Sequence, residues 1–597
     1  MVNFVSNFWW IPLYPFFGAL LAAVLRRYAS FIAPAAIGAS FLHTLAVVYS
    51  PRGGPLEHTL YQWMPGIAFR FLADDLTLLM LLIVTGIGFL IHVYSIGYMA
   101  GEPGLWRYFA CLNLFVFFML LLVLASNLVV LFAGWEGVGL ASYLLIGFHH
   151  DRPTVNRNAN KAFLYNRAGD AGFLLGTLIL LSAAGTTEFK DMNQLGASPL
   201  TFLAALLLAL GATGKSAQLP LFVWLPDAMV GPTPVSALIH AATMVTAGIY
   251  LFARLAPFLA ANPDAGLIIA GIGALTALIA ATIAFSENDI KRILAYSTVS
   301  QLGLMFLAAG LGATDAAIFH VATHAFFKAL LFLCAGNIIH ALKGEQDIRY
   351  MGGLRHKMPW TFRLMTIGGL SLAGFPGLAG FFSKDAILMA ATQSPVLLAT
   401  ALIVSFITAA YTSRMLWGIF FGNYDRQAHE AQATTLHTLW PLALGSILAG
   451  YFGPHLEGAW PIMLVSATIS IAGLYFGRNV RLPEFLQIFF QRKWFINDAY
   501  ETVLVGTVTK RGSSALNWLD NNVIDLVPRA SGWLTTALSL ISGWLDRYIV
   551  DGAVKATAIS IETSSFPVRL LQTGRTHNYA LVIALSLAAT FGWYWLQ

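Results

Sequence analysis

The chain contains repeated apolar runs of about 20 residues, and these runs leave few folds open to it. Inside a membrane every backbone N–H and C=O must be bonded within the protein, so a spanning segment is a helix or a strand of a closed barrel. Barrel strands alternate with a period of two residues, whereas these runs are apolar on every side. Of the 597 residues, 58% are hydrophobic and only 10% are charged. The sequence therefore predicts an all-α integral membrane protein.

We predict about 16 transmembrane helices, because each crossing needs about 20 apolar residues. The predicted spans are residues 8–25, 31–50, 75–99, 107–126, 128–149, 168–185, 200–225, 232–254, 264–285, 294–311, 315–341, 362–391, 396–421, 437–454, 459–477 and 578–596. The N-terminal residues lack a basic segment and a small-residue cleavage site, so we expect no cleaved signal peptide.

Basic residues concentrate in the loops on one side of this arrangement. Loops after odd-numbered spans contain Arg26, Arg27, Arg107, Arg152, Arg157, Lys161, Lys291, Arg292, Lys343, Arg349, Arg355, Lys357, Arg426, Arg478, Arg481, Arg492 and Lys493. Loops after even-numbered spans contain only Arg52, Arg70, Lys190 and Arg254. The positive-inside rule then places both termini on the periplasmic side of a bacterial inner membrane.

Residues 213–250 place charge deep in apolar sequence. Lys215 is followed by Pro220, and His240 lies in the next apolar run. A charged side chain at the centre of a membrane helix costs roughly 3 kcal/mol on insertion scales, so it normally faces a polar interior. Pro220 is expected to break or kink the helix beside the lysine, as in the ion sites of transporters. The stretch favours a proton or cation pathway; alternatively, Lys215 snorkels to the interface.

Earlier in the chain, Glu136 lies in a helix rich in small residues, which allow a close neighbour to bury it. Arg167 and Asp170 are three residues apart and share a helix face. They either form a pair that connects to Glu136 or Lys215, or form an ordinary interfacial pair. The alternative for Glu136 is an ion pair that only fixes helix register. We hypothesise that Glu136 controls how tightly Lys215 holds its proton, because a nearby negative charge favours the ammonium form.

The second half repeats this pattern. His320, His324 and Lys328 recur at a spacing of four residues, which places them on one stripe of a helix. An HxxxH pair can bind zinc, but no glutamate follows the first histidine and no third ligand is evident, so we predict a proton relay and no metal. Pro376 then interrupts another span before Lys384 and Asp385. A buried lysine and a proline-interrupted span in each half indicate internal repeats.

Residues 483–577 are too polar to span a membrane. Leu534, Leu538, Ile541, Leu545 and Tyr548 recur at helical spacing, as do residues 516, 519, 523 and 526 upstream, and Pro528 is expected to introduce a kink. This pattern predicts a long amphipathic helix that lies along a surface of lipid or protein, re-anchored by the span 578–596.

No residues for a redox cofactor are evident. Cys111 and Cys334 lie far apart in apolar runs, without the spacing of a metal or iron–sulfur site. We also find no flavin, haem or nucleotide motif, so we expect no cofactor in this chain.

Several runs resemble a known family: GWEGVGLASYLLIGF, GKSAQLPLFVWLPDAMVGPTPVSALIHAATMVTAG, AYSTVSQLG, HAFFKALLFL and GFFSKDAIL. They are similar to the largest antiporter-like membrane subunits of respiratory complex I, the NADH:quinone oxidoreductase, which are homologous to Mrp-type cation/proton antiporter subunits. The likeness covers nearly the whole chain. It implies redox-driven proton translocation, with FMN, iron–sulfur clusters and quinone in partner subunits, and with a lateral helix that contacts neighbouring antiporter-like subunits.

The resemblance assigns the family's channel residues to Glu136, Lys215, His240, Lys328 and Lys384, with Asp385 beside the last. Arg167 and Asp170 match the family's pair next to the glutamate, and His320 and His324 match its connecting histidines. The implied organisation is 1–106 N-terminal helices, 107–254 first repeat, 255–425 second repeat, 426–482 additional helices, 483–577 lateral helix and 578–597 anchor. A subunit of an Mrp-type Na+/H+ antiporter or ion-pumping hydrogenase, and a mainly structural clamp, are the alternatives.

Overall fold

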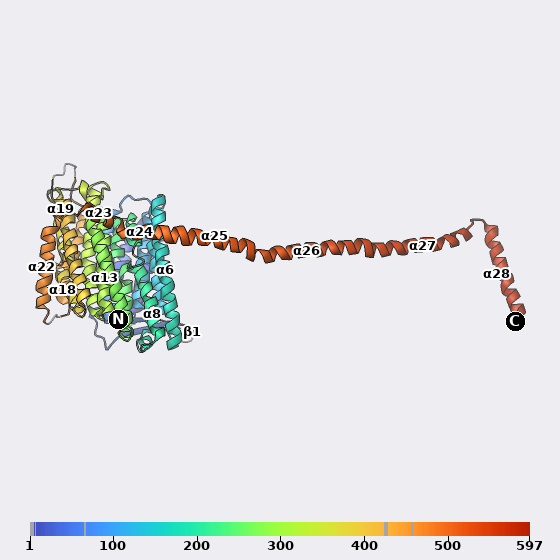
Figure 1. The fold of residues 1–597 in the computed structure, drawn as a ribbon, viewed down its shortest axis with the longest axis horizontal. Helices are drawn as coiled ribbons and strands as arrows, with labels where there is room; N and C mark the ends of the chain where they lie inside the picture. Colours follow the sequence, from blue (N-terminus) through green and yellow to red (C-terminus); the bar gives the residue numbers. More distant parts are fainter. Residues whose placement is uncertain (1–4, 6, 65–66, 423–427, 455–457, 481) are drawn as a thin grey trace. The chain divides into compact units, whose positions relative to one another are not determined.

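The computed structural model describes residues 5, 7–64, 67–422, 428–454, 458–480 and 482–597, so Arg426 and Arg481 lie outside the described residues. It contains two compact units, Met1–Asn497 and Asp498–Gln597 (Figure 1). The first unit is a bundle of helices, and the second is a succession of helices.

Within the described ranges, twelve helices are long and apolar enough to cross a membrane. They are α2 (Ala29–Tyr49), α3 (Asp75–Tyr98), α4 (Leu105–Leu124), α5 (Leu128–Ile146), α6 (Pro153–Ala184), the interrupted pair α10 (Thr233–Ala241) and α11 (Ala247–Arg254), α13 (Pro263–Ser286), α14 (Ile290–Gly310), α15 (Thr314–Ala341), α19 (Pro395–Phe420), α22 (Trp460–Gly477) and α28 (Thr576–Leu596). The chain is therefore a multi-pass integral membrane protein, as the sequence predicted.

The remaining predicted spans coincide with shorter or interrupted helices. These are α1 (Leu13–Val24), α8 (Pro199–Lys215), α17 (Pro359–Ala373) with α18 (Ala379–Ala391), and α21 (Leu439–Leu448). Helix α6 begins fifteen residues before its predicted start, so Lys161 lies on a helix instead of in a loop. Lys291 and Arg292 likewise lie in the first turn of α14.

Three helices are interrupted within the bundle. Helix α8 ends at Lys215, and helical structure resumes only at α9 (Trp224–Asp227), with Pro220 in the gap. Helices α17 and α18 are separated by a segment that holds Pro376 and two glycines with positive φ, Gly374 and Gly377. A glycine tolerates this backbone conformation without steric cost.

The sequence analysis missed the third interruption, between α10 and α11. No proline occurs there. Instead the hydroxyl of Thr243 donates to Leu238 O (2.5 Å) and that of Thr246 donates to Thr243 O (2.8 Å). Threonine hydroxyls compete with the helix for backbone acceptors, and this effect is too common in sequences to mark a break by itself.

The all-α prediction is wrong for residues 56–73. Strands β1 (Leu56–Met64) and β2 (Ile67–Ala73) form an antiparallel hairpin between α2 and α3, with Leu56 opposite Ala73. In β2, Ala68, Phe71 and Ala73 are buried and the other side chains are half-buried, so the period of two expected for a strand is interrupted once, at Phe69 and Arg70.

Glycines bring α13 and α14 into backbone contact. A Cβ built on Gly273 would lie 2.5 Å from Gly303 O, and one on Gly310 would lie 2.5 Å from Gly266 O. Small residues at a membrane helix interface allow this close approach, which strengthens van der Waals packing. Helix α14 also packs against α15, the helix that carries the histidine stripe.

We expect Gly273→Val to destabilise the folded protein, because overpacking a closed interface costs about 1–3 kcal/mol. Gly271→Val is the matched control, since Gly271 lies on the same helix and a Cβ added there would have open space within 4 Å. Thermal unfolding of both purified variants checks this. Equal melting temperatures for the two variants would contradict the close seam.

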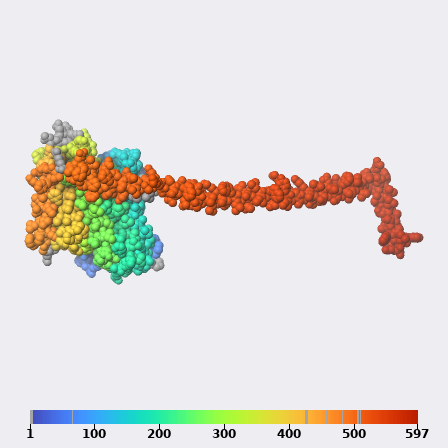
Figure 2. Space-filling view, in the orientation of Figure 1, coloured from blue at the N-terminus to red at the C-terminus, as the bar shows by residue number. Residues whose placement is uncertain are grey.

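The second unit is almost wholly helical. Helices α25 (Lys510–Leu519), α26 (Leu526–Leu545) and α27 (Asp551–Leu571) are joined by π-helical segments, η9 (Asp520–Ile524) and η10 (Asp546–Val550). Pro528 lies in the first turn of α26, where a missing N–H costs little, so the interruption falls before it and not at it. Among the unit's described residues, no second element packs beside these helices (Figure 2). The side chains of their apolar stripe are exposed.

Candidate functional site

Helices α5, α6 and α8 bring four charged side chains together. Arg167 forms an ion pair with Glu136, and its Nε lies 3.6 Å from Oδ2 of Asp170. The same Oδ2 lies 3.8 Å from Nζ of Lys215. Oδ1 of Asp170 accepts a 2.6 Å hydrogen bond from the indole of Trp135. The four residues form a chain of alternating charge that ends at the lysine.

This arrangement corrects the hypothesis that Glu136 acts directly on Lys215. The carboxylate beside Lys215 is that of Asp170, and Glu136 is the partner of Arg167. Spacing along α6 could show that Arg167 and Asp170 share a face. It could not show which of them would point at Lys215.

Lys215 is completely buried, and Asp170 is 4% exposed. Space for the ammonium comes from Gly139 on α5, where an added Cβ would lie 2.7 Å from Nζ. The ring of Trp135 lies 5.8 Å from Nζ and offers its electron-rich face to the cation. Nζ has no hydrogen-bond acceptor at bonding distance among the described residues, so its charge depends on Asp170 and Trp135.

The interruption after Lys215 is closed by side-chain hydrogen bonds. Gln218 donates to Ser216 O (2.8 Å) and Val299 O (3.3 Å), and the indole of Trp224 donates to Gly214 O (2.9 Å). A helix end inside a membrane protein needs such partners for its last carbonyls. The break is therefore a stable feature of the fold.

A second charged cluster lies in the connector that leads from this break to α10. Asp227 is within 2.7 Å of Nζ of Lys161, 3.6 Å of Nζ of Lys493 and 3.9 Å of Nη2 of Arg292. Burial raises the pKa of Asp227, but these three cations outweigh it, and the net pKa lies below the ordinary carboxyl value. Nearby Lys291 is buried and donates to Met229 O (2.6 Å) and Gly231 O (2.8 Å).

Two cations that the sequence places in loops have structural roles. Lys291 holds the connector carbonyls, and Arg254 is 7% exposed and pairs with Asp74, the N-cap of α3 (Nη2 to Oδ1, 2.8 Å). The sequence signal for Arg254 is its place at the end of an apolar run. That place alone does not separate a buried pair from an interfacial cation.

The histidine stripe lies along α15, and all three side chains are fully buried. His320 uses both ring nitrogens, Nδ1 with Oγ of Ser383 (2.9 Å) and Nε2 with Oε1 of Gln301 (3.1 Å). The ring of His324 lies 6.1 Å from that of His320, and neither of its nitrogens has a partner among the described residues. Lys328 donates to Leu294 O (3.2 Å) and to the hydroxyl of Ser297.

His240 lies in the last turn of α10 and faces this stripe. Its ring centroid lies 4.9 Å from that of Phe332 on α15, and neither ring nitrogen is bonded within the part of the chain that the structure describes. His240 and His324 are thus two buried imidazoles with free hydrogen-bonding capacity, which a water chain could use.

Lys384 and Asp385 lie on α18, after the break that contains Pro376. Nζ of Lys384 donates to Leu372 O (2.6 Å), a carbonyl in the last turn of α17. Both carboxylate oxygens of Asp385 are buried without a hydrogen-bond partner in the described residues. Ser383 on the same helix contacts His320, so α18 joins the stripe to the second lysine.

Apart from the Asp227 cluster, the groups singled out from the sequence form two clusters, one around Lys215 and one along α15 and α18. Each contains a lysine beside a helix break. His240, on α10, lies in the sequence between Lys215 and the α15 stripe. Such groups can hold and release protons, while the apolar packing around them excludes bulk water.

Comparison with known proteins gives a consistent result. A family profile described as "NADH:quinone oxidoreductase/Mrp antiporter, TM" matches residues 125–409, and one described as "NADH-Ubiquinone oxidoreductase (complex I), chain 5 N-terminus" matches residues 63–109. The NADH-ubiquinone oxidoreductase chain 5 of Metridium senile is 41% identical over 549 residues, 88% of this chain and 90% of that protein. The chain belongs to the NADH:quinone oxidoreductase/Mrp antiporter family. The resemblance seen in the sequence is confirmed.

Two further matches extend the family assignment. The NADH-quinone oxidoreductase subunit L of Escherichia coli (strain K12) is 47% identical over 419 residues, 67% of this chain and 68% of that protein. The structure of an Mrp complex from Dietzia sp. DQ12-45-1b matches with a TM-score of 0.67 and 27% identity, over 99% of this chain and 66% of that chain. All the charged and histidine residues of the two clusters lie within the matched range 125–409.

We expect Asp170→Asn to lower the rate of proton pumping about tenfold or more while the complex still assembles. Asparagine keeps an acceptor for Trp135 but removes a charge about 4 Å from Lys215, worth about 4 kcal/mol at an effective dielectric of 20. Asp191→Asn, at an exposed position, is the control. Wild-type pumping by Asp170→Asn together with lost pumping by Glu136→Gln would restore Glu136 as the direct partner.

The Asp227 cluster predicts a pH-dependent difference in stability. Because the folded-state pKa of Asp227 is lowered, its contribution is present above the unfolded carboxyl pKa of about 4 and is lost as the pH falls through the folded value. The melting temperature of Asp227→Asn should therefore lie below that of the wild type at pH 7. The two should converge below about pH 4. A constant difference across this range would show that the carboxylate charge is not responsible.

Proposed function

We propose that this chain is a proton-translocating membrane subunit of an NADH:quinone oxidoreductase. The observation that carries the proposal is the complete burial of Lys215, balanced by Asp170 and placed at a helix break within a multi-pass bundle. The family assignment and the similarity to subunit L and chain 5 proteins support the same function. The redox reaction, with FMN, iron–sulfur clusters and quinone, belongs to partner subunits.

In the proposed mechanism, Arg167 and Lys215 compete for Asp170. When Asp170 faces Lys215, the ammonium is stabilised and the lysine holds its proton. When Arg167 leaves Glu136 and draws Asp170 to itself, Lys215 loses about 4 kcal/mol of attraction, a factor of about 1000 in proton affinity. Lys215 then gives up its proton. Glu136 acts by pairing with Arg167, which limits the pull of the guanidinium on Asp170 while Nε of Arg167 and Nζ of Lys215 lie 3.6 and 3.8 Å from the same Oδ2.

The proton would continue through His240 to the groups along α15 and α18. His240 and His324 have unbonded ring nitrogens among the described residues, and His320 connects through Ser383 to the helix of Lys384 and Asp385. The distances between these groups require water molecules as links. Asp385, whose oxygens accept from no donor in the described ranges, is the proposed last acceptor before the opposite side of the membrane.

The same proposal includes the membrane topology, the internal repeats and the place of the second unit. We infer about 16 membrane crossings of about 20 residues each, with two inverted repeats that place the Lys215 and Lys384 breaks at corresponding depths. Both termini would face the periplasm of a bacterial inner membrane. The second unit would lie laterally along neighbouring antiporter-like subunits as a clamp, with α28 as its anchor.

The match to an Mrp complex supports a second candidate, a subunit of a cation/proton antiporter, because it spans 99% of this chain. In that case the same lysines would exchange protons for cations without a redox reaction. A clamp without translocation is the third candidate. A clamp without translocation does not explain why the protein buries a charged lysine, which costs folding free energy.

Lys215→Ala tests the proposal directly. In membrane vesicles that carry the assembled complex, verified on a native gel, we expect NADH-driven proton pumping to be lost, because the charge that exchanges the proton is gone. Lys190→Ala, at an exposed site, should pump as the wild type does. Full pumping by Lys215→Ala would reduce this chain to a clamp, and pumping that depends on Na+ instead of NADH would favour the antiporter.

A further inference from the structure

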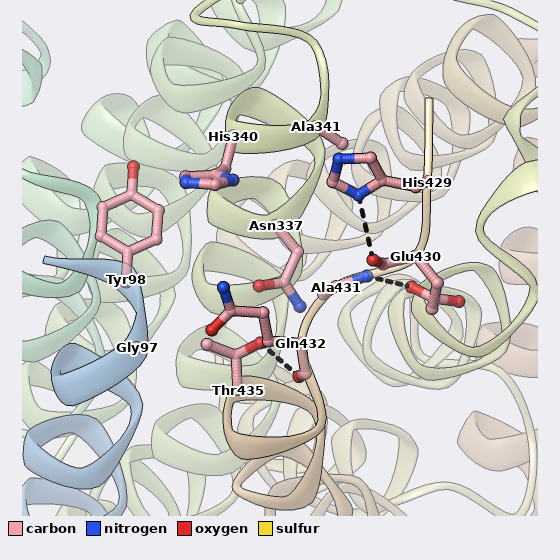
Figure 3. Close-up of a pocket in the computed structure, with 10 residues that line it drawn as sticks. All are labelled: Gly97, Tyr98, Asn337, His340, Ala341, His429, Glu430, Ala431, Gln432 and Thr435. Carbon is pink, nitrogen blue, oxygen red and sulfur yellow. Dashed lines mark hydrogen bonds between the residues drawn. The ribbon is translucent and has the colours of Figure 1, made fainter. Parts of the chain in front are cut away.

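A small pocket opens where α3 and α15 end, against residues 429–435. It has a volume of about 80 Å³, and its lining includes two histidines, His340 and His429, with Glu430 and the amide of Asn337 (Figure 3). Space of this size holds several water molecules if polar partners are present. The pocket lies beside the loops in which the basic residues concentrate, the inner side under the positive-inside rule.

Glu430 builds the wall of this pocket. Its carboxylate accepts from the backbone N–H of Trp360 (2.7 Å) and from the hydroxyl of Thr361 (2.6 Å), so it caps the first turn of α17. These bonds fix residues 429–431 against the helix ends. The imidazoles of His340 and His429 are the remaining groups of the pocket that can exchange protons with solvent.

The floor of the pocket is polar and incompletely bonded. Asn337 is 4% exposed, and its amide nitrogen has no partner among the described residues. Its carbonyl oxygen accepts from the hydroxyl of Tyr94 (2.8 Å). A buried amide N–H without an acceptor costs about 1–3 kcal/mol, so a water in the pocket is its natural partner.

Polar contacts continue from this floor into the bundle. Tyr98 stacks on Tyr94, with ring centroids 5.6 Å apart, and its hydroxyl lies 3.0 Å from Oγ1 of Thr233. Thr233 is the first residue of α10, and His240 lies in the last turn of the same nine-residue helix. At 1.5 Å per residue the two are about 10 Å apart along the axis.

We infer that this pocket is the entrance of a proton-uptake path. The path begins on the side of the membrane where the basic loops lie and leads to His240. His340 and His429 collect protons at the surface, Asn337 orders water at the floor, and the hydroxyls of Tyr98 and Thr233 lead to α10. The inference rests on the proposed proton translocation. It adds the entrance, which neither the sequence motifs nor the charged clusters locate.

Thiol labelling tests water access to the floor. In a Cys111→Ser, Cys334→Ala background, Asn337→Cys should react with a small charged methanethiosulfonate that does not cross membranes. The reaction should occur in inside-out vesicles and not in right-side-out vesicles. Absence of labelling from either side would overturn the assignment, whatever the outcome for Lys215→Ala, and labelling from the outer side alone would do the same.

Pumping variants test the use of the path. Asn337→Leu should lower the initial rate of NADH-driven pumping to about a tenth or less, because leucine removes the amide that orders water at the floor of the pocket and leaves the water chain without this partner. Asn337→Ser, which keeps a hydrogen-bonding group, should recover most of the rate. His437→Leu, at an exposed site on nearby α20 (Ala433–His437), is the control for His340→Leu.

The result separates the two proposals. Lost pumping in Lys215→Ala with wild-type pumping in both Asn337→Leu and His340→Leu would overturn the entrance and leave the proposed function intact. Assembly on a native gel guards against misfolding, and the labelling experiment does not require turnover.

Discussion

The first half of the bundle depends on the carboxylate of Asp170, which serves an indole, a guanidinium and an ammonium at once. Lys215 can remain charged in a dry interior only while this negative charge stays close. The surrounding packing follows from that need. Gly139 leaves room for the ammonium, and close contact between α6 and α8 at Gly169 and Gly214 brings the two charges together.

At two interruptions in this protein, a buried lysine bonds the backbone carbonyls that the interruption leaves free. An interrupted helix leaves backbone carbonyls without intrahelical partners, and in water-free surroundings they must be bonded. Lys384 takes Leu372 O at the break after α17, and Lys291 takes Met229 O and Gly231 O in the connector before α10. At these two places the interruption supplies the acceptors that stabilise a buried cation, whereas the break after Lys215 is closed by Gln218 and Trp224.

The sequence predicted the membrane class, the approximate positions of twelve spans and two of the three interruptions, because apolar length and proline are strong local signals. It did not predict the break between α10 and α11, which depends on threonine hydroxyls, or the hairpin of residues 56–73. It also named Glu136 instead of Asp170 as the neighbour of Lys215. The choice between two nearby carboxylates depends on how three helices pack, and periodicity along one helix carries no information on that.

The second unit has a consequence for how the protein is made. In the part that the structure describes, its helices pack against nothing within the unit, and large side chains such as Leu540, Trp533 and Phe566 are 72%, 69% and 63% exposed. A newly synthesised copy therefore exposes these apolar side chains, which promote aggregation, until lipid or a partner subunit covers them. Cells would have to couple its synthesis to that of its binding partners, or rely on chaperones and proteases to remove the surplus, so the abundance of this subunit should follow that of its assembly.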